Sequence, residues 1–282
     1  MAKEYQYRPH IRWFLYYVIP LITGIGIALT WLVIVFLSVI KKGSFEDLML
    51  DGISLSGLFL LQAVIFGYLF YRLTVVRVSI SDGGINYKHH SGNIQIRPEE
   101  ITKIQFPSLP YMGGWIKIIA GSKTIRLTVV VEAIGDFLKE LKELLDQSGN
   151  AHRYDRKKFF GFLKTATYAD QSWARLYSFF GVLIMTIIVL VVAALSLGLF
   201  ADIPMIWLAL LVMASPLWPL GAWIVCELRL ARKFAKGASE EGFFCPPRDP
   251  VYERTLFHRG LLMAGMVYGL IFIGFMIPRL FG

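Results

Sequence analysis

The chain has 282 residues, of which 56% are hydrophobic, 15% aromatic and only 17% charged. In a soluble domain about a quarter of the residues are charged, so this composition excludes a single soluble globule. The large share of apolar residues also excludes a disordered chain. The formal net charge of +9 comes from 29 Lys and Arg against 20 acids.

Five long apolar stretches without Asp, Glu, Lys, Arg or His are the first feature in chain order. An apolar stretch of about 18 residues or more is typical of a membrane-spanning helix. The third and fourth stretches lie close together and predict a tight hairpin, and Pro216 and Pro219 predict a kink or local unwinding in the fourth. The stretches cover residues 13–40, 53–71, 176–201, 203–226 and 260–278.

The basic residues predict the orientation of these spans. Segments 1–12, 72–175 and 226–259 hold 26 of the 29 Lys and Arg residues. Cytoplasmic loops of membrane proteins carry such an excess of basic side chains. We therefore expect the N-terminus and Gly149 in the cytoplasm and Gly282 outside, in a multi-pass membrane protein.

Between the second and third spans, the hydrophobic pattern changes from helical to strand-like. Val76, Val78 and Ile80 alternate with polar residues, which predicts a half-buried strand, and about five more short strands follow up to residue 130. The next stretch has apolar residues at the spacing of a core-facing helix: Ile134, Phe137, Leu138, Leu141, Leu144 and Leu145. The pattern predicts a small antiparallel α+β domain over residues 73–150.

Two phrases in this region carry a resemblance to a known family. Residues 78–85 read Val-Ser-Ile-Ser-Asp-Gly-Gly-Ile, and residues 96–104 read Ile-Arg-Pro-Glu-Glu-Ile-Thr-Lys-Ile. Together with the two preceding spans, they resemble bacterial pleckstrin-homology-like (PH-like) integral membrane proteins, mainly over residues 53–150. Arg97 is interposed before Pro98, where the family phrase has Ile-Pro. The resemblance implies a binding and assembly module in the bacterial inner (cytoplasmic) membrane, and it carries over no catalytic residue.

These features divide the chain into six expected parts. The predicted fold is an α-helical polytopic membrane protein with five transmembrane helices and an inserted PH-like α+β domain. The parts are an N-terminal transmembrane hairpin (1–72), the PH-like domain (73–150), a basic amphipathic segment (151–175), a second hairpin (176–226), a cytoplasmic loop (227–259) and a C-terminal transmembrane helix (260–282).

The segment 151–175 is the first candidate site, because cations are interleaved with Phe159, Phe160 and Phe162. On a helix the aromatic rings could enter the membrane interface while the cations meet anionic lipid headgroups. The same charges are also expected of an ordinary cytoplasmic flank, and the sequence leaves both readings open. The candidate headgroup-binding residues are Arg153, Arg156, Lys157, Lys158 and Lys164.

Small residues in the last span form a candidate face for helix association. Gly260 and Ala264 are four residues apart, as are Gly265 and Gly269. In lipid, such small side chains allow helix backbones to approach closely. We expect packing within the chain or against a partner helix.

Residues with catalytic or metal-binding potential are few. The sequence has no HExxH or CxxC motif, and Cys226 and Cys245 are expected to be free thiols. Glu227 and Arg229, just past the fourth span, could form an active-site pair or simply extend to the interface as flanking charges. Lys88, His89 and His90 could bind phosphate or form a solvated hairpin tip. We expect no metal and no cofactor.

The sequence therefore predicts a non-enzymatic inner-membrane scaffold, assembly factor or accessory subunit. Its expected partners are membrane lipids and another integral membrane protein or a second copy of itself, with no nucleic acid. The alternative is a membrane enzyme or transporter component that acts on lipid headgroups at the cytoplasmic interface. A deep polar pocket lined by Glu227, Arg229, Asp249 or the histidines would favour that alternative.

Overall fold

The computed structural model describes residues 3–41, 45–81, 83–107, 114–200 and 205–280. Residues 201–204, at the predicted hairpin between the third and fourth spans, and Gly282, for which an outside location is expected, lie outside this set. Contacts divide the chain into two units, Met1–Phe162 and Leu163–Gly282. Each unit is described by itself.

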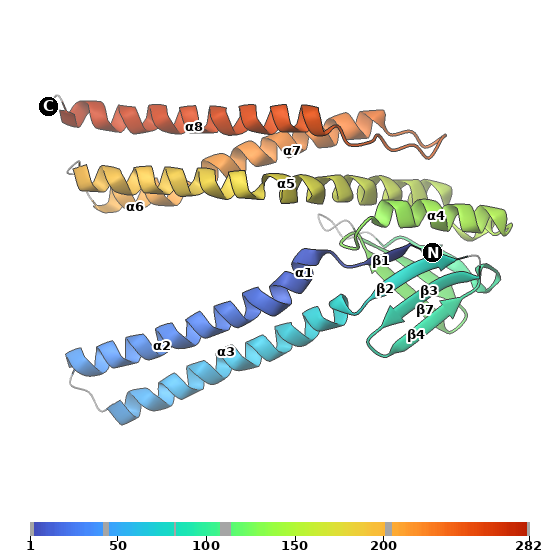
Figure 1. Cartoon of the computed structure of the whole chain (residues 1–282), viewed down its shortest axis with the longest axis horizontal. Helices are drawn as coiled ribbons and strands as arrows, with labels where there is room; N and C mark the ends of the chain where they lie inside the picture. The colour runs from blue at the N-terminus through green and yellow to red at the C-terminus, as the bar shows by residue number, and fades with distance from the viewer. Residues whose placement is uncertain (1–2, 42–44, 82, 108–113, 201–204, 281–282) are drawn as a thin grey trace. The chain divides into compact units, whose positions relative to one another are not determined.

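The first unit contains a hairpin of two long helices. A short helix α1 (Pro9–Trp13) and a π-helical turn η1 (Phe14–Val18) lead directly into α2 (Ile19–Lys41), and α3 (Phe45–Thr74) runs back beside α2 (Figure 1). A Cβ atom built on Gly26 would lie 2.7 Å from the ring of Phe59. The glycine therefore allows the two apolar helices to pack closely.

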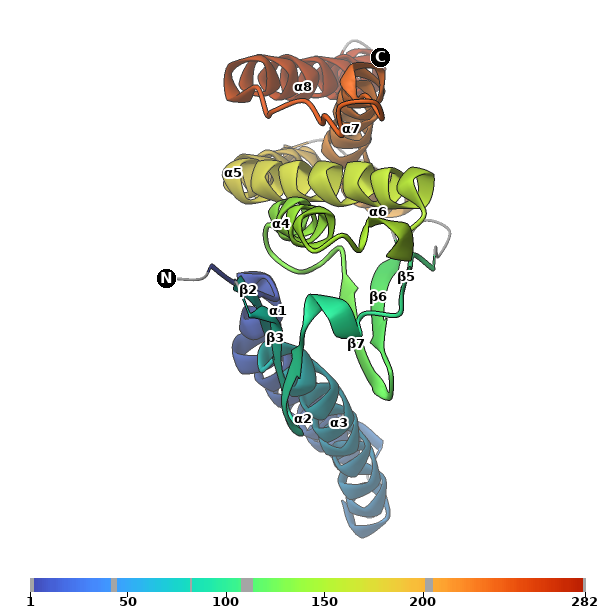
Figure 2. The same cartoon turned by 90° about the vertical axis from the view of Figure 1, so that its right-hand side faces the viewer.

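The rest of this unit includes two antiparallel sheets, seen as separate layers in Figure 2. The first sheet has the order β1-β2-β3-β4 and the second the order β5-β6-β7, with a short 3₁₀ turn η2 (Pro98–Glu100) between them. The strands are β1 (Glu4–Gln6), β2 (Arg77–Ser81), β3 (Gly84–His89), β4 (Gly92–Ile96), β5 (Lys103–Gln105), β6 (Trp115–Ala120) and β7 (Lys123–Thr128).

Helix α4 (Ile134–Gln147) closes the core of these sheets. The predicted apolar face of α4 is confirmed for five of its six residues: Ile134, Phe137, Leu138, Leu141 and Leu145 are fully buried, whereas Leu144 is half-buried. The strands contribute alternate side chains to the same interior: Val78, Ile85, Ile96, Ile116, Ile118, Ile125 and Leu127. We call the two sheets with α4 the β module.

Strand β1 was not predicted from the sequence. It comes from before the first helix and pairs with β2 in the register Glu4–Ser79, Tyr5–Val78 and Gln6–Arg77. The Tyr5 ring is buried and makes an edge contact with Phe137 of α4, with the ring centroids 5.5 Å apart. The β module thus includes chain from both ends of the α2–α3 hairpin.

The second unit contains the rest of α5 (Arg156–Phe200), with α6 (Met205–Ala214), α7 (Leu217–Gly237) and α8 (Pro250–Leu280). The predicted break in the fourth span is confirmed: α6 ends and α7 begins around Ser215 and Pro216, since proline has no N–H to donate. Ser215 is buried, and its hydroxyl lies 2.9 Å from the Tyr268 hydroxyl of α8.

Four helical segments among the described residues are long and apolar enough to cross a membrane, as expected of a multi-pass membrane protein. They overlap the first four predicted spans and cover Pro9–Phe36, Leu48–Thr74, Arg156–Ser196 and Leu208–Gly237. The fifth predicted span, 260–278, lies inside α8 but is not among these four, so it stays a prediction.

The basic segment 151–175 and the loop 227–259 contain more helix than the sequence predicted. From Arg156 onward, residues of the 151–175 segment belong to the single helix α5. In the 227–259 loop, α7 continues to Gly237 and α8 begins at Pro250. Charged residues flanking the apolar stretches therefore sit on rigid helices.

Candidate functional site

A buried ionic cluster joins three helices of the second unit. Arg175 of α5 donates from Nε and Nη2 to the two carboxylate oxygens of Glu227 of α7, both at 2.8 Å. Its Nη1 donates to Glu253 Oε1 of α8 at 3.0 Å. The Arg175 and Glu253 side chains are 1% and 3% exposed, so this is a desolvated cluster.

Further polar groups complete the cluster. The Tyr168 hydroxyl lies 2.7 Å from Glu227 Oε2, and the Ser172 hydroxyl donates to the same oxygen at 3.3 Å. Tyr168, Ser172 and Arg175 follow one another at spacings of four and three residues, which places them on one face of α5. Arg248 donates from Nε to Glu253 Oε2. The two arginines balance the two carboxylates.

This arrangement is suited to holding helices together. A general base needs an available lone pair, and a general acid needs a proton to give. The Glu227 carboxylate instead accepts from Arg175, Tyr168 and Ser172, and the Glu253 carboxylate accepts from two arginines. Removing one member of such a buried ion pair strongly destabilises the fold, because it leaves the other charge buried and unpaired. We call the set Tyr168, Ser172, Arg175, Glu227, Arg248 and Glu253 the ionic clamp.

Glu227, for which the sequence left open an active-site pair with Arg229 or a flanking charge, bonds to Arg175. Arg175 directly precedes the third predicted span, which begins at residue 176, and so looks like a flanking charge in the sequence. One feature of the sequence could have indicated the cluster: the acids Glu227 and Glu253 lie close to the predicted spans, among many basic residues. A buried acid needs a partner.

A pocket of about 380 Å³ lies beside the clamp and is lined by Arg175, Glu253, Asp249 and Lys233 among others. The Lys233 ammonium lies 3.8 Å from the centre of the Tyr252 ring. Of the residues expected to line an enzymatic pocket, Asp249 does so, whereas Glu227 points into the clamp and Arg229 lines a different groove.

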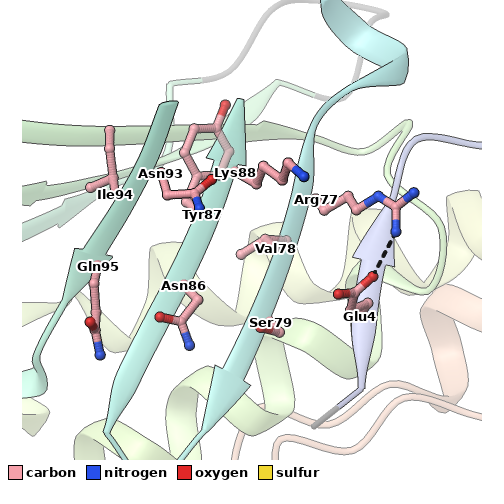
Figure 3. A pocket seen from close by; sticks show the side chains of 10 residues that line it. All are labelled: Glu4, Arg77, Val78, Ser79, Asn86, Tyr87, Lys88, Asn93, Ile94 and Gln95. Carbon is pink, nitrogen blue, oxygen red and sulfur yellow. Dashed lines mark hydrogen bonds and ion pairs between the residues drawn. The ribbon is translucent and has the colours of Figure 1, made fainter. Parts of the chain in front are cut away.

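The outer face of the first sheet forms a second polar surface, which we call the sheet face. Figure 3 shows its side chains on four neighbouring strands, with Arg77 Nη1 bonded to Glu4 Oε2 at 3.1 Å. Lys88, from the predicted hairpin tip, lies opposite Arg77 in the β2–β3 register. The pocket on this face measures about 470 Å³ and is lined by Glu4, Arg77, Val78, Ser79, Asn86, Tyr87, Lys88, Asn93, Ile94 and Gln95.

The three phenylalanines on which the amphipathic reading of the 151–175 segment rests, Phe159, Phe160 and Phe162, are buried within the protein. Phe159 and Phe162 both contact the Phe106 ring, at 5.3 and 5.5 Å between centroids. The Tyr154 ring makes a tilted contact with Phe159, with 4.8 Å between the centroids, and its hydroxyl donates to Asp146 of α4. Burial and this hydrogen bond raise the pKa of Tyr154 to about 12. The rings belong to the protein interior, because aromatic side chains of the β module cover them.

The candidate headgroup-binding cations lie around the start of α5. Arg156, Lys157 and Lys158 are exposed in its first turn, and Arg153 and Lys164 are half-buried. The three exposed cations are Arg156, Lys157 and Lys158, and Lys158 Nζ lies 4.0 Å from Asp155 Oδ2. Lipid binding by them stays a prediction.

The small-residue face of α8 divides into two parts. A Cβ atom on Gly260 would lie 2.7 Å from Cys226 Sγ of α7, and Ala264 is buried. A Cβ atom on Gly265 or Gly269 would meet no atom within 4 Å. Gly260 and Ala264 thus serve packing within the chain, whereas Gly265 and Gly269 leave open space beside them.

The described residues contain no group of three His, Cys, Asp or Glu side chains arranged to hold a metal ion. Cys226 is buried, Cys245 is half-buried, and neither forms a disulfide. Comparisons with protein-family models, with curated proteins and with solved structures found no match for this chain.

Proposed function

We propose that the protein is a non-enzymatic scaffold, assembly factor or accessory subunit of a membrane complex in the bacterial inner membrane. In this proposal the chain spans the membrane five times, with the N-terminus and the β module in the cytoplasm and the C-terminus outside. The β module is a PH-like binding module, and its ligand is another integral membrane protein of the complex.

One observation carries the proposal: strand β1 ties the β module to the base of the helical hairpin. The chain enters α1 at Pro9, two residues after Tyr7, and leaves α3 at Thr74, three residues before β2 begins. Since β1 and β2 are paired, both ends of the hairpin are fixed in one sheet. Such a connection presents the sheet face at a fixed height above the membrane, as a docking module requires.

The architecture of the β module supports its proposed PH-like nature. Four antiparallel strands in one sheet, three in the other and a helix at the C-terminal side agree with what the sequence resemblance implies. The sheet face then supplies polar groups for a partner, with Lys88 as an exposed cation near its centre.

The ionic clamp argues against the enzymatic alternative. Its carboxylates accept hydrogen bonds from arginines and hydroxyls, which leaves them poorly suited to proton transfer. In the proposed role, the clamp keeps α5, α7 and α8 in register.

The test is purification of the full chain in mild detergent, followed by mass spectrometry of what co-purifies. We expect a membrane protein to co-purify with the wild type and with Lys103→Glu, and to be lost with Lys88→Glu. Both lysines are exposed on strands of the β module, but Lys103 lies on the other sheet. Equal recovery with both variants, or headgroup release from phospholipid vesicles by the purified chain, would contradict the proposal.

A further inference from the structure

A groove of about 740 Å³ runs between α7 and α8. On α7 it extends from Leu217 to Arg229, a separation of twelve residues that corresponds to about 18 Å of helix. One leaflet of a bilayer has about 15 Å of hydrocarbon. The groove is therefore about as long as one leaflet is deep.

The groove has a floor of small residues and an open, apolar rim. Gly260 approaches Cys226 on the floor, and Gly221 has nothing within 4 Å of a Cβ position, so space remains above it. Leu217 and Met263, on the two helices, are 65% and 62% exposed. An apolar chain could lie in this space and contact both helices.

The charged residues of the groove are Arg229 of α7 and Arg259 of α8, while its other lining residues are uncharged. Both arginines are exposed, and within the part of the chain that the structure describes neither forms an ion pair. They lie at the same end of the groove, because α7 and α8 run antiparallel. Arg229 follows the apolar part of α7, and Arg259 precedes the apolar part of α8. The opposite end, near Leu217 and Val267, is apolar.

We propose that this groove binds one anionic phospholipid, with its phosphate at Arg229 and Arg259 and an acyl chain along the groove. Arginine recognises phosphate through charge-assisted hydrogen bonds. An apolar transmembrane helix in the same groove would leave both guanidinium groups without a counter-charge, whereas a phospholipid supplies the apolar and the anionic part together. The site is separate from the sheet face and does not depend on its role.

Native mass spectrometry of the full chain in detergent tests the proposal, with dioleoylphosphatidylglycerol and dioleoylphosphatidylcholine as the probes. We expect the wild type to retain one phosphatidylglycerol in preference to phosphatidylcholine. Arg229→Gln with Arg259→Gln should weaken phosphatidylglycerol binding about thirtyfold, the size expected for two cations near an anionic headgroup. The matched control is Arg232→Gln with Arg254→Gln, which removes two exposed arginines from the same helices outside the groove.

A second pair of variants tests the apolar part. Gly221→Leu fills the groove without meeting any atom within 4 Å of its Cβ, so the fold should persist while lipid binding is lost. Gly269→Leu has the same open surroundings but lies outside the groove, and it should retain the lipid. Three results would overturn the proposal: equal weakening by both arginine pairs, equally tight binding of free inorganic phosphate, or a Gly221→Leu variant that keeps its lipid and loses oligomeric mass. The last result would assign the groove to a partner helix.

Discussion

In the β module, the side chains between the sheets and α4 are aliphatic or aromatic, whereas α5, α7 and α8 meet through buried charged side chains as well as through an apolar cluster of Phe179, Leu230 and Phe257. Ile85, Ile116 and Leu141 are fully buried in the module, which water drives together through the hydrophobic effect. Lipid offers apolar side chains no comparable drive, so helices in a membrane associate through close packing and hydrogen bonds. The ionic clamp and the contact of Gly260 with Cys226 are of that second kind.

The largest effect should come from Leu141→Asp, which places a charge in the apolar interior of the module. Burying an unpaired carboxylate among Ile134, Phe137 and Leu145 should destabilise the module by more than about 4 kcal/mol. Limited proteolysis of the full chain should then cut within residues 77–147. An unchanged cleavage pattern would show that this face of α4 is not buried.

Next in size should be Arg175→Gln, which leaves Glu227 and Glu253 without their shared partner. Loss of one member of a buried ion cluster typically costs about 3–5 kcal/mol, so the thermal unfolding temperature in detergent should fall clearly. Arg254→Gln removes an exposed arginine of α8 and serves as the control. If both variants unfold at the same temperature, the clamp does not hold the helices together.

A smaller and different effect is expected on the two sides of α8. Gly260→Leu should lower thermal stability, because even its Cβ would meet Cys226, and such overpacking costs about 1–3 kcal/mol. Gly265→Leu with Gly269→Leu should leave stability unchanged and reduce recovery of a partner or homo-oligomer, measured as particle mass in detergent. Leu270→Ala, at an exposed position of α8, is the control. Retained mass with both glycines replaced would remove Gly265 and Gly269 from any association surface.

The elements that follow a local pattern could be predicted from the sequence. The alternation from Val76 and the stripe around Leu141 indicated the strands and α4, since each pattern reports one buried face. Strand β1 has only three residues, and its pairing with β2 joins positions more than seventy residues apart. No local pattern reports such a contact.

The clamp and the aromatic segment escaped prediction for a related reason. Whether Arg175 meets Glu227 and Glu253 depends on how three helices are rotated about their axes, and hydropathy does not specify this. In the same way, an amphipathic pattern shows that Phe159 and Phe162 share an apolar environment without showing whether it is lipid or protein. Here the environment is the ring of Phe106.

Single-cysteine labelling in intact cells tests the account most directly, because the cytoplasmic β module and the fifth span both depend on topology. In a Cys245→Ser background, where Cys226 is buried, cysteine replaces either the exposed Gln147 at the end of α4 or Gly282 at the C-terminus. We expect a membrane-impermeant maleimide to label the position 282 variant in intact cells and the position 147 variant only after permeabilisation. Labelling of both positions from the same side would contradict the five-span account.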